Sequence, residues 1–111
     1  MKVAELLQSK GQTVISITPD KSVIEALKIL NDNKISSLVV LDAGKKLAGI
    51  ITERDIFRAA TLDYDGLKSK KVADLMSTHL IVGTLEDDID YVKGIMTQNR
   101  IRHLPIVAKE G

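Results

Sequence analysis

The stretch Gly49-Ile50-Ile51-Thr52-Glu53-Arg54-Asp55 (GIITERD) decides how the middle of this chain folds. The apolar run at residues 47–51 is rich in β-branched side chains and predicts a buried strand. Thr52 then offers an N-cap oxygen, and Asp55 stands three residues later, where a capping box places its acceptor. Apolar residues follow at helical spacing: Ile56, Phe57, Ala59 and Ala60. The stretch therefore predicts a strand that passes directly into a capped helix.

The chain contains an internal duplication around this stretch. Residues 3–7 reappear as residues 72–76, and residues 14–41 align without a gap onto residues 80–107. Charge class and apolar phase stay in step over both blocks, which indicates a true repeat. We therefore divide the chain into repeat 1 (1–60), a polar linker (61–71) and repeat 2 (72–111).

Both repeats predict the same order of elements. These are a short helix (3–8 and 72–77), a strand (14–17 and 80–82), a long helix, and a buried strand (37–41 and 103–108). Asp20 or Ser22 caps the first long helix. Asp87 or Asp88 caps the second. The side chains expected to face inward from these helices are Val23, Ala26, Leu27, Leu30, Ile89, Val92, Ile95 and Met96.

Repeat 1 continues through a tight turn at residues 42–46 into the strand at 47–51. The counterparts of residues 49–55 in repeat 2 would lie beyond Gly111. We therefore expect repeat 2 to lack its last strand and helix in this sequence, and the sequence leaves open whether the natural protein lacks them too. Their absence would uncover apolar surface near Val107, so we expect a homodimer, with this surface covered by the partner or by residues beyond those of the present sequence.

Composition narrows the classes of function. The chain has 111 residues, of which 44% are hydrophobic and only 3% aromatic, so a compact domain with an aliphatic core is expected. Sixteen basic and 15 acidic residues, without a basic tract, predict no nucleic-acid partner. The absence of cysteine excludes disulfides, and two distant histidines do not predict a metal site. No run approaches the roughly 20 apolar residues of a membrane span, no signal peptide is recognisable, and a cytoplasmic protein is predicted.

The duplicated chain resembles the tandem cystathionine β-synthase (CBS) domain pair, or Bateman module, over essentially its whole length. Residues 49–55 are similar to the family signature Gly-h-h-Thr/Ser-x-x-Asp, in which h is apolar, and residues 100–106 resemble its h-x-x-h-P-h strand. The variant looks most like small stand-alone prokaryotic pairs. The resemblance implies an α/β (α+β) fold of two β-α-β-β-α repeats about a pseudo-twofold axis. It also implies clefts between the repeats that bind AMP, ADP, ATP, NAD(H) or S-adenosylmethionine.

The resemblance assigns polar roles to five residues. Asp55 would accept hydrogen bonds from both ribose hydroxyls, and its alternative is a helix cap alone. Thr52 would donate to ribose or phosphate, beside the free amides of a helix N-terminus. Arg102 and His103, with Arg54 as an addition, would contact phosphate. The alternatives are a solvated strand end for Arg102 and a hydrogen-bonded core residue for His103.

The adenine would need an apolar slot. The candidates, for each of which plain core packing is the alternative, are Ile35, Ile50, Met76, Leu80, Ile81 and Ile101. Gly49 would let the backbone approach either a ligand or a facing strand, and the sequence does not choose between them.

Two functions remain open. No P-loop, nucleophile elbow or dinucleotide fingerprint is present, so we expect no enzyme. The first function is a regulatory module that binds an adenine nucleotide, with AMP favoured, and requires no cofactor or metal. A single competent site would be built on Thr52 and Asp55 and closed by Arg102 and His103. The alternative is a ligand-independent domain for dimerisation or protein docking, and the downstream partner is not indicated.

Overall fold

The computed structural model describes residues 1–5, 14–80, 82–99 and 103–107. The chain forms two compact units. The central unit is Ile15–His79, and the terminal unit combines Met1–Val14 with Leu80–Gly111. Residues 72–79 of repeat 2 therefore belong to the central unit, whereas the first residues of repeat 1 belong to the terminal unit. Within the described ranges, no helix is long and apolar enough to cross a membrane.

The central unit contains a three-stranded sheet with the order β1-β2-β3. Its strands are β1 (Ser16–Ile17), β2 (Ser37–Leu41) and β3 (Leu47–Thr52). β1 runs parallel to β2, and β2 runs antiparallel to β3. The turn between β2 and β3 is closed by Asp42, whose Oδ1 accepts from the amides of Gly44 at 2.9 Å and Lys46 at 3.0 Å. The predicted strand at 37–41 and the predicted turn are confirmed.

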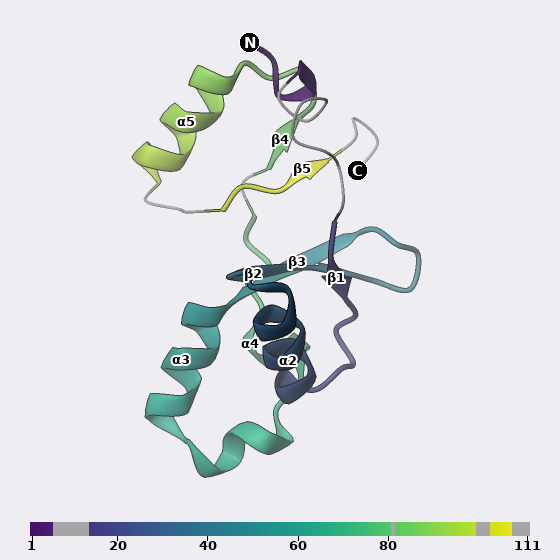
Figure 1. The fold of residues 1–111 in the computed structure, drawn as a ribbon, viewed down its shortest axis with the longest axis vertical. Coiled ribbons are helices and arrows are strands. Elements are labelled where there is room, and N and C mark those ends of the chain that lie inside the picture. Colours follow the sequence, from purple (N-terminus) through teal and green to yellow (C-terminus); the bar gives the residue numbers. More distant parts are fainter. Residues whose placement is uncertain (6–13, 81, 100–102, 108–111) are drawn as a thin grey trace. The chain divides into compact units, whose positions relative to one another are not determined.

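Helices pack on one face of this sheet (Figure 1). They are α2 (Val23–Asn33), α3 (Glu53–Leu62) and the short α4 (Val72–Leu75). α2 begins at Ser22, whose hydroxyl accepts from the amide of Glu25 at 3.1 Å, so Ser22 rather than Asp20 is the N-cap. Burial alternates along β2, and Leu38 and Val40 are completely buried. The core consists of Ile17, Val23, Ala26, Leu30, Leu38, Val40, Ile51, Ile56, Leu67 and Val72.

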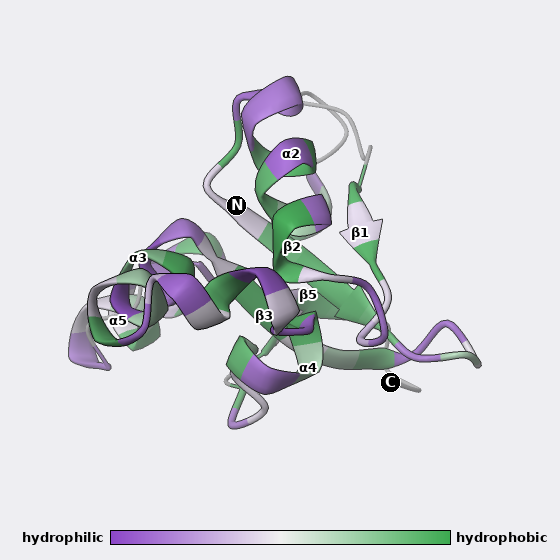
Figure 2. Ribbon diagram, turned by 90° about the horizontal axis from the view of Figure 1, so that it is seen from below, coloured by the Kyte–Doolittle hydropathy of each residue, from purple (hydrophilic) through white to green (hydrophobic). Residues whose placement is uncertain are grey.

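Figure 2 shows the division of polarity that produces this core. The strands of the central sheet are largely hydrophobic, and the helices alternate between hydrophobic and hydrophilic residues. The prediction that Leu27 faces inward is wrong, because this side chain is 36% exposed. Leu27 lies about 100° around the helix from Ala26, and the packed stripe of α2 follows Val23, Ala26 and Leu30 instead.

The segment predicted as a linker is folded onto the central unit. After α3 ends, the 3₁₀ helix η1 (Asp65–Ser69) places Leu67 in the core with 7% exposure. The carbonyl of Lys70 then accepts from the amide of Val23 at 3.0 Å. α4 ends earlier than the predicted helix at 72–77 because Met76 adopts an extended conformation. The division into repeats with a linker at 61–71 stays a prediction about the sequence.

The terminal unit contains α5 (Ile89–Gln98) and a parallel pair, β4 (Gly83–Thr84) and β5 (Ile106–Val107). The predicted strand at 80–82 is therefore displaced. The predicted strand at 103–108 is shorter in its described part, and residue 108 lies outside the described residues. Gly83 donates to the carbonyl of Pro105 at 2.8 Å. Pro105 itself has no amide hydrogen to donate, so the regular pairing starts at Ile106.

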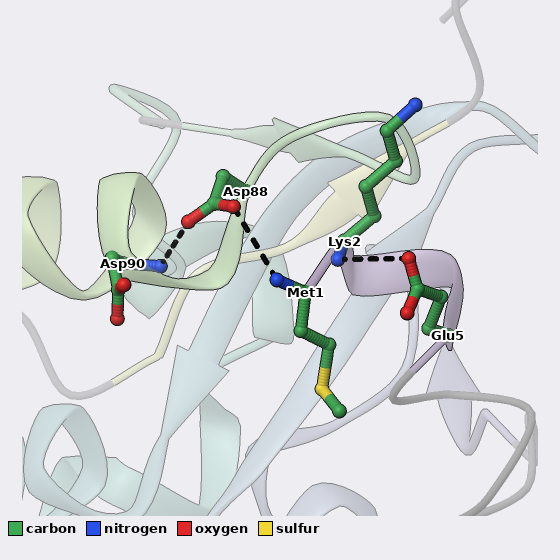
Figure 3. A network of polar contacts seen from close by, with 5 residues as sticks. All are labelled: Met1, Lys2, Glu5, Asp88 and Asp90. Atoms are coloured by element: carbon green, nitrogen blue, oxygen red, sulfur yellow. Dashed lines mark hydrogen bonds and ion pairs between the residues drawn. The ribbon is translucent and has the colours of Figure 1, made fainter.

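The first residues of the chain are held against the start of α5 (Figure 3). Asp88 is the N-cap of α5 and accepts from the amide of Asp90 at 2.9 Å, and this bond lowers the pKa of Asp88. The ammonium of Met1 lies 3.5 Å from the Asp88 carboxylate. Lys2 lies 3.0 Å from Glu86, and this hydrogen bond raises the pKa of Lys2. These exposed bonds supplement the backbone bond from the Val3 amide to the Asp87 carbonyl.

The core predicts that alanine substitutions of two leucines in the central unit change the free energy of unfolding by different amounts. Leu38→Ala should lower the free energy of unfolding by about 2–5 kcal/mol, because it opens a cavity at a fully buried position. Leu27→Ala should change it by less than about 1 kcal/mol, because that side chain is partly exposed. Urea unfolding followed by circular dichroism measures both. Equal losses in the two variants would contradict the placement of α2.

Candidate functional site

The candidate site lies where β3 passes into α3. Thr52 is the last residue of β3 and also the N-cap of α3. It pairs with Ser37 at the start of β2, and the amide of Glu53 donates to the carbonyl of Ser36 at 2.9 Å. The start of β2 and the first turn of α3 are therefore neighbours at one end of the central sheet.

Thr52 and Asp55 form a reciprocal capping box. The Thr52 hydroxyl accepts from the Asp55 amide at 3.2 Å. The Asp55 Oδ2 atom accepts from the Thr52 amide at 2.9 Å and from the Thr52 hydroxyl at 3.0 Å. All three bonds are partly buried. The predicted capping box is confirmed, and its bonds fix the Asp55 carboxylate at the first turn of α3.

These bonds determine what the two side chains can still offer. Both bonds accepted by Asp55 fall on Oδ2, and a carboxylate can accept about four. Asp55 can therefore accept further hydroxyl groups, most directly at Oδ1. The hydroxyl hydrogen of Thr52 points to Asp55, so Thr52 can accept from a ligand hydroxyl in this arrangement. Donation to a phosphate would require that hydroxyl to turn away from Asp55.

The N-terminus of α3 offers fewer amides than the sequence suggests. The Glu53 amide donates to the Ser36 carbonyl, and the Asp55 amide donates to the Thr52 hydroxyl. Of the first three amides of the helix, this leaves the one of Arg54. The Arg54 side chain is exposed on the same turn. An anion at this end would therefore be bound mainly by side chains.

Three of the apolar candidates lie in the central unit. Ile35, Ile50 and Met76 are half-buried, and Ile35 and Met76 pack against the core cluster. Ile50 and Thr52 share one face of β3, because side chains alternate along a strand and Ile51 between them is completely buried. The ribose candidates and part of the apolar candidates thus belong to one folded unit.

The remaining candidates belong to the terminal unit. Leu80 and His103 are half-buried there. Arg102, Ile81 and Ile101 lie outside the described residues. Their predicted roles, and that of His103 toward phosphate, stay predictions. Among the residues with a described position, no group of three or more His, Asp or Glu side chains is arranged to hold a metal ion.

Gly49 is required by a facing segment of the chain. The amide of Ile50 donates to the Ser77 carbonyl at 3.1 Å, and the amide of Ser77 donates to the Ile50 carbonyl at 2.9 Å. A Cβ atom on Gly49 would lie 2.7 Å from the Ser77 oxygen and 3.0 Å from the Met76 sulfur. Of the two roles left open for Gly49, close approach to a facing segment is therefore the one the structure shows.

Sequence reasoning did not identify Ser77 as a neighbour of this site. The local signal for its position is weak, since only the change from apolar residues to Ser77-Thr78-His79 marks the end of α4. Its pairing with Ile50 depends on a contact between residues far apart in the sequence. That contact brings a third segment of chain to β3.

The capping box predicts a difference between two substitutions of Thr52. Thr52→Val removes the hydroxyl that bonds Asp55 and should lower the free energy of unfolding by about 1 kcal/mol. Thr52→Ser keeps the hydroxyl and should lower it less. Thermal and urea unfolding measure both. A Thr52→Val protein as stable as Thr52→Ser would show that the box contributes little.

Comparisons with known proteins give one family. The family model described as "CBS domain" matches residues 3–61 and 72–111. The crystal structure of a CBS-domain containing protein, ATU1752 from Agrobacterium tumefaciens, is 32% identical with a TM-score of 0.91, over 97% of this chain and 81% of that one. The CBS domain pair of protein MJ0100, in complex with 5-methylthioadenosine and S-adenosyl-L-methionine, is 27% identical with a TM-score of 0.83, over 98% and 82%.

Curated relatives are longer proteins. CBS domain-containing protein CBSX3, mitochondrial, from Arabidopsis thaliana is 35% identical over 98% of this chain, which spans 57% of that relative. Inosine-5'-monophosphate dehydrogenase from Nitrosopumilus maritimus is 36% identical over 86% of this chain, which spans 19% of that enzyme. The chain therefore spans less than two-thirds of the length of these relatives.

Proposed function

Because this chain belongs to the CBS-domain family, we propose that it is a regulatory module that binds an adenosyl ligand reversibly and catalyses no reaction. The observation that carries the proposal is the Asp55 carboxylate, which is fixed at the first turn of α3 and can accept further hydroxyl groups. The adenosyl ligands of the MJ0100 domain pair support the ligand class. AMP is the ligand we favour, and no cofactor is required.

The chemistry of the ligand fits the residues around Asp55. The two ribose hydroxyls would donate to Asp55, with Thr52 accepting beside it. The adenine would lie against Ile50, whose side chain shares a face of β3 with Thr52. Met76 packs against the core cluster, so its role toward adenine stays a prediction from the sequence. Arg102, His103 and Arg54 would bind the phosphate, because a guanidinium matches phosphate oxygens in geometry and charge. These roles are part of the proposal.

Regulation would follow from differential affinity. A ligand shifts a conformational equilibrium only by as much as it prefers one state over the other. One relative is an inosine-5'-monophosphate dehydrogenase. We therefore propose that ligand occupancy of this module controls an associated protein, whose identity the chain does not indicate. The cytoplasmic location and the absence of a nucleic-acid partner stay predictions from composition.

Calorimetric titration with AMP, ATP, NADH and S-adenosylmethionine tests the proposal. At least one should bind with a dissociation constant below about 1 mM, and AMP should bind at one site per chain. Asp55→Asn should weaken AMP binding by about tenfold or more, because it removes the charge that strengthens the ribose bonds. Its amide oxygen can still accept from the Thr52 amide, so stability should change little.

Adenosine lacks the phosphate of AMP, so titration with both compounds separates the phosphate contacts from the contacts to ribose and adenine. Arg102→Ala should weaken binding of AMP and leave binding of adenosine unchanged. If no adenosyl ligand binds the unmodified protein below about 1 mM, nucleotide sensing loses its main support. Two equivalent nucleotides per chain would instead show that the proposal of a single site is wrong.

An exposed apolar surface favours the second candidate, a ligand-independent dimerisation or docking domain. Phe57 is 70% exposed, Leu62 88% and Tyr64 75%, and all three lie on or just after α3. A contiguous exposed apolar patch marks an interaction site, and these three side chains come from one short stretch of the chain. We propose a homodimer through this surface, which is compatible with nucleotide binding as well.

Light scattering tests the homodimer. The unmodified chain should have the mass of a dimer, and Phe57→Asp should shift it toward monomer, because a charge would be buried in an apolar contact. Arg58→Asp, at the neighbouring exposed position of α3, is the matched control and should leave the dimer intact. A monomeric unmodified protein would refute the dimer. A dimer unaffected by Phe57→Asp would refute this surface as its interface.

A further inference from the structure

Residues 76–79, here called the strap, meet the outer edge of β3 at Ser77. The strap is joined to β3 by the two backbone hydrogen bonds between Ile50 and Ser77, which form an isolated bridge. Gly49 allows this approach, because a Cβ atom there would meet the Ser77 oxygen. The other edge of β3 is paired with β2 along its length. The strap is thus the least extensively bonded neighbour of this strand.

The strap is built to detach more easily than the rest of the central unit. The side chains of Ser77, Thr78 and His79 are exposed, so only Met76 supplies packing. Single backbone hydrogen bonds contribute little net stability, and segments with few buried contacts open at low free-energy cost. The chain after His79 continues directly into the terminal unit. The strap is therefore the covalent connection between the two units on this side.

The strap also adjoins the proposed ligand residues. Ile50 supplies the backbone that holds Ser77, and its side chain shares a face of β3 with Thr52. Met76 lies against the Gly49 position on the core-facing side of the same strand, so that Met76 anchors the strap to the core. An adenine that contacts the Ile50 side chain would lie on the residue whose backbone holds the strap. Such a ligand would bind the fastened strap better than the detached one.

We propose that the strap is a positioning segment of the adenosyl site, and that its attachment to β3 is coupled to ligand binding. The inference rests on the proposed function, since it assigns Ile50 to the ligand. Ligand binding raises the equilibrium constant for attachment of the strap to β3. By linkage, attachment of the strap raises the affinity for the ligand by that same factor.

Two substitutions of Ser77 test the hydrogen bonds between the strap and β3. Ser77→Pro removes the amide that donates to the Ile50 carbonyl. Met76 already has φ −64° and ψ 150°, a conformation that is accepted before proline. Ser77→Ala keeps the amide and changes only an exposed side chain, so it is the matched control.

Titration with AMP and hydrogen exchange of the Ile50 and Ser77 amides are the measurements. In the unmodified protein, AMP should slow exchange at both amides. Ser77→Pro should weaken AMP binding on the order of tenfold, within the usual range for coupled sites, while Ser77→Ala binds as the unmodified protein does. Equal AMP affinity in the two variants, with faster Ile50 exchange in Ser77→Pro, would overturn the coupling and leave the proposed function standing.

A second pair of variants tests the same coupling if the Ser77→Pro protein does not fold. Gly49→Ala should push the strap away through its contact with the Ser77 oxygen and weaken AMP binding similarly. Gly94→Ala, where an added Cβ meets nothing within 4 Å, is its control and should bind AMP normally. Unchanged affinity in Gly49→Ala would overturn the inference. Failure of the unmodified protein to bind AMP or any other adenosyl ligand would overturn the proposed function itself, and the coupling with it.

Discussion

The reciprocal hydrogen bonds between Thr52 and Asp55 are the interaction that directs the chain from the central sheet into α3. They end a strand and begin a helix at the same residue, so β3 and α3 meet without a connecting loop. The helix then returns to cover the sheet, and Ile56 enters the core that Leu38 and Val40 form from β2. The same bonds fix the carboxylate that we assign to the ribose. In the proposed function, folding and ligand chemistry use one pair of side chains, and Asp55 would combine the two roles that the sequence presents as alternatives.

Local chemistry explains which elements the sequence predicts well. The strand at 37–41, the turn closed by Asp42 and the capping box depend on residues within a few positions of each other. The sequence-based predictions are wrong where contacts between residues far apart in the sequence determine the structure. The strand expected at 80–82 lies instead at β4, because its partner after Pro105 sets the register. Leu27 is exposed because the angle at which α2 packs, and not helical spacing alone, selects the buried stripe.

The same difference between local and distant contacts decides which residues of the candidate site can be predicted from the sequence. Thr52 and Asp55 are recognisable from a spacing of three residues, and the structure shows the local geometry that this spacing predicts. Ser77 leaves almost no local signal, since its place beside Ile50 depends on a contact between repeats of the sequence. Gly49 shows the intermediate case: its lack of a side chain is visible in the sequence, but the segment that needs the space is visible only in the fold.

The order in which the segments of the two units occur in the sequence affects folding during translation. The central unit is continuous, whereas the terminal unit joins the first 14 residues to the last 32, from Leu80 to Gly111. On the ribosome, at about 5–20 residues per second, the opening segment therefore waits on the order of seconds for its partners to be translated. During that interval Val3, which ends 4% exposed, has no pocket to enter. The central unit can complete its core first, so the nascent chain acquires its Thr52–Asp55 junction before the two segments of the terminal unit meet.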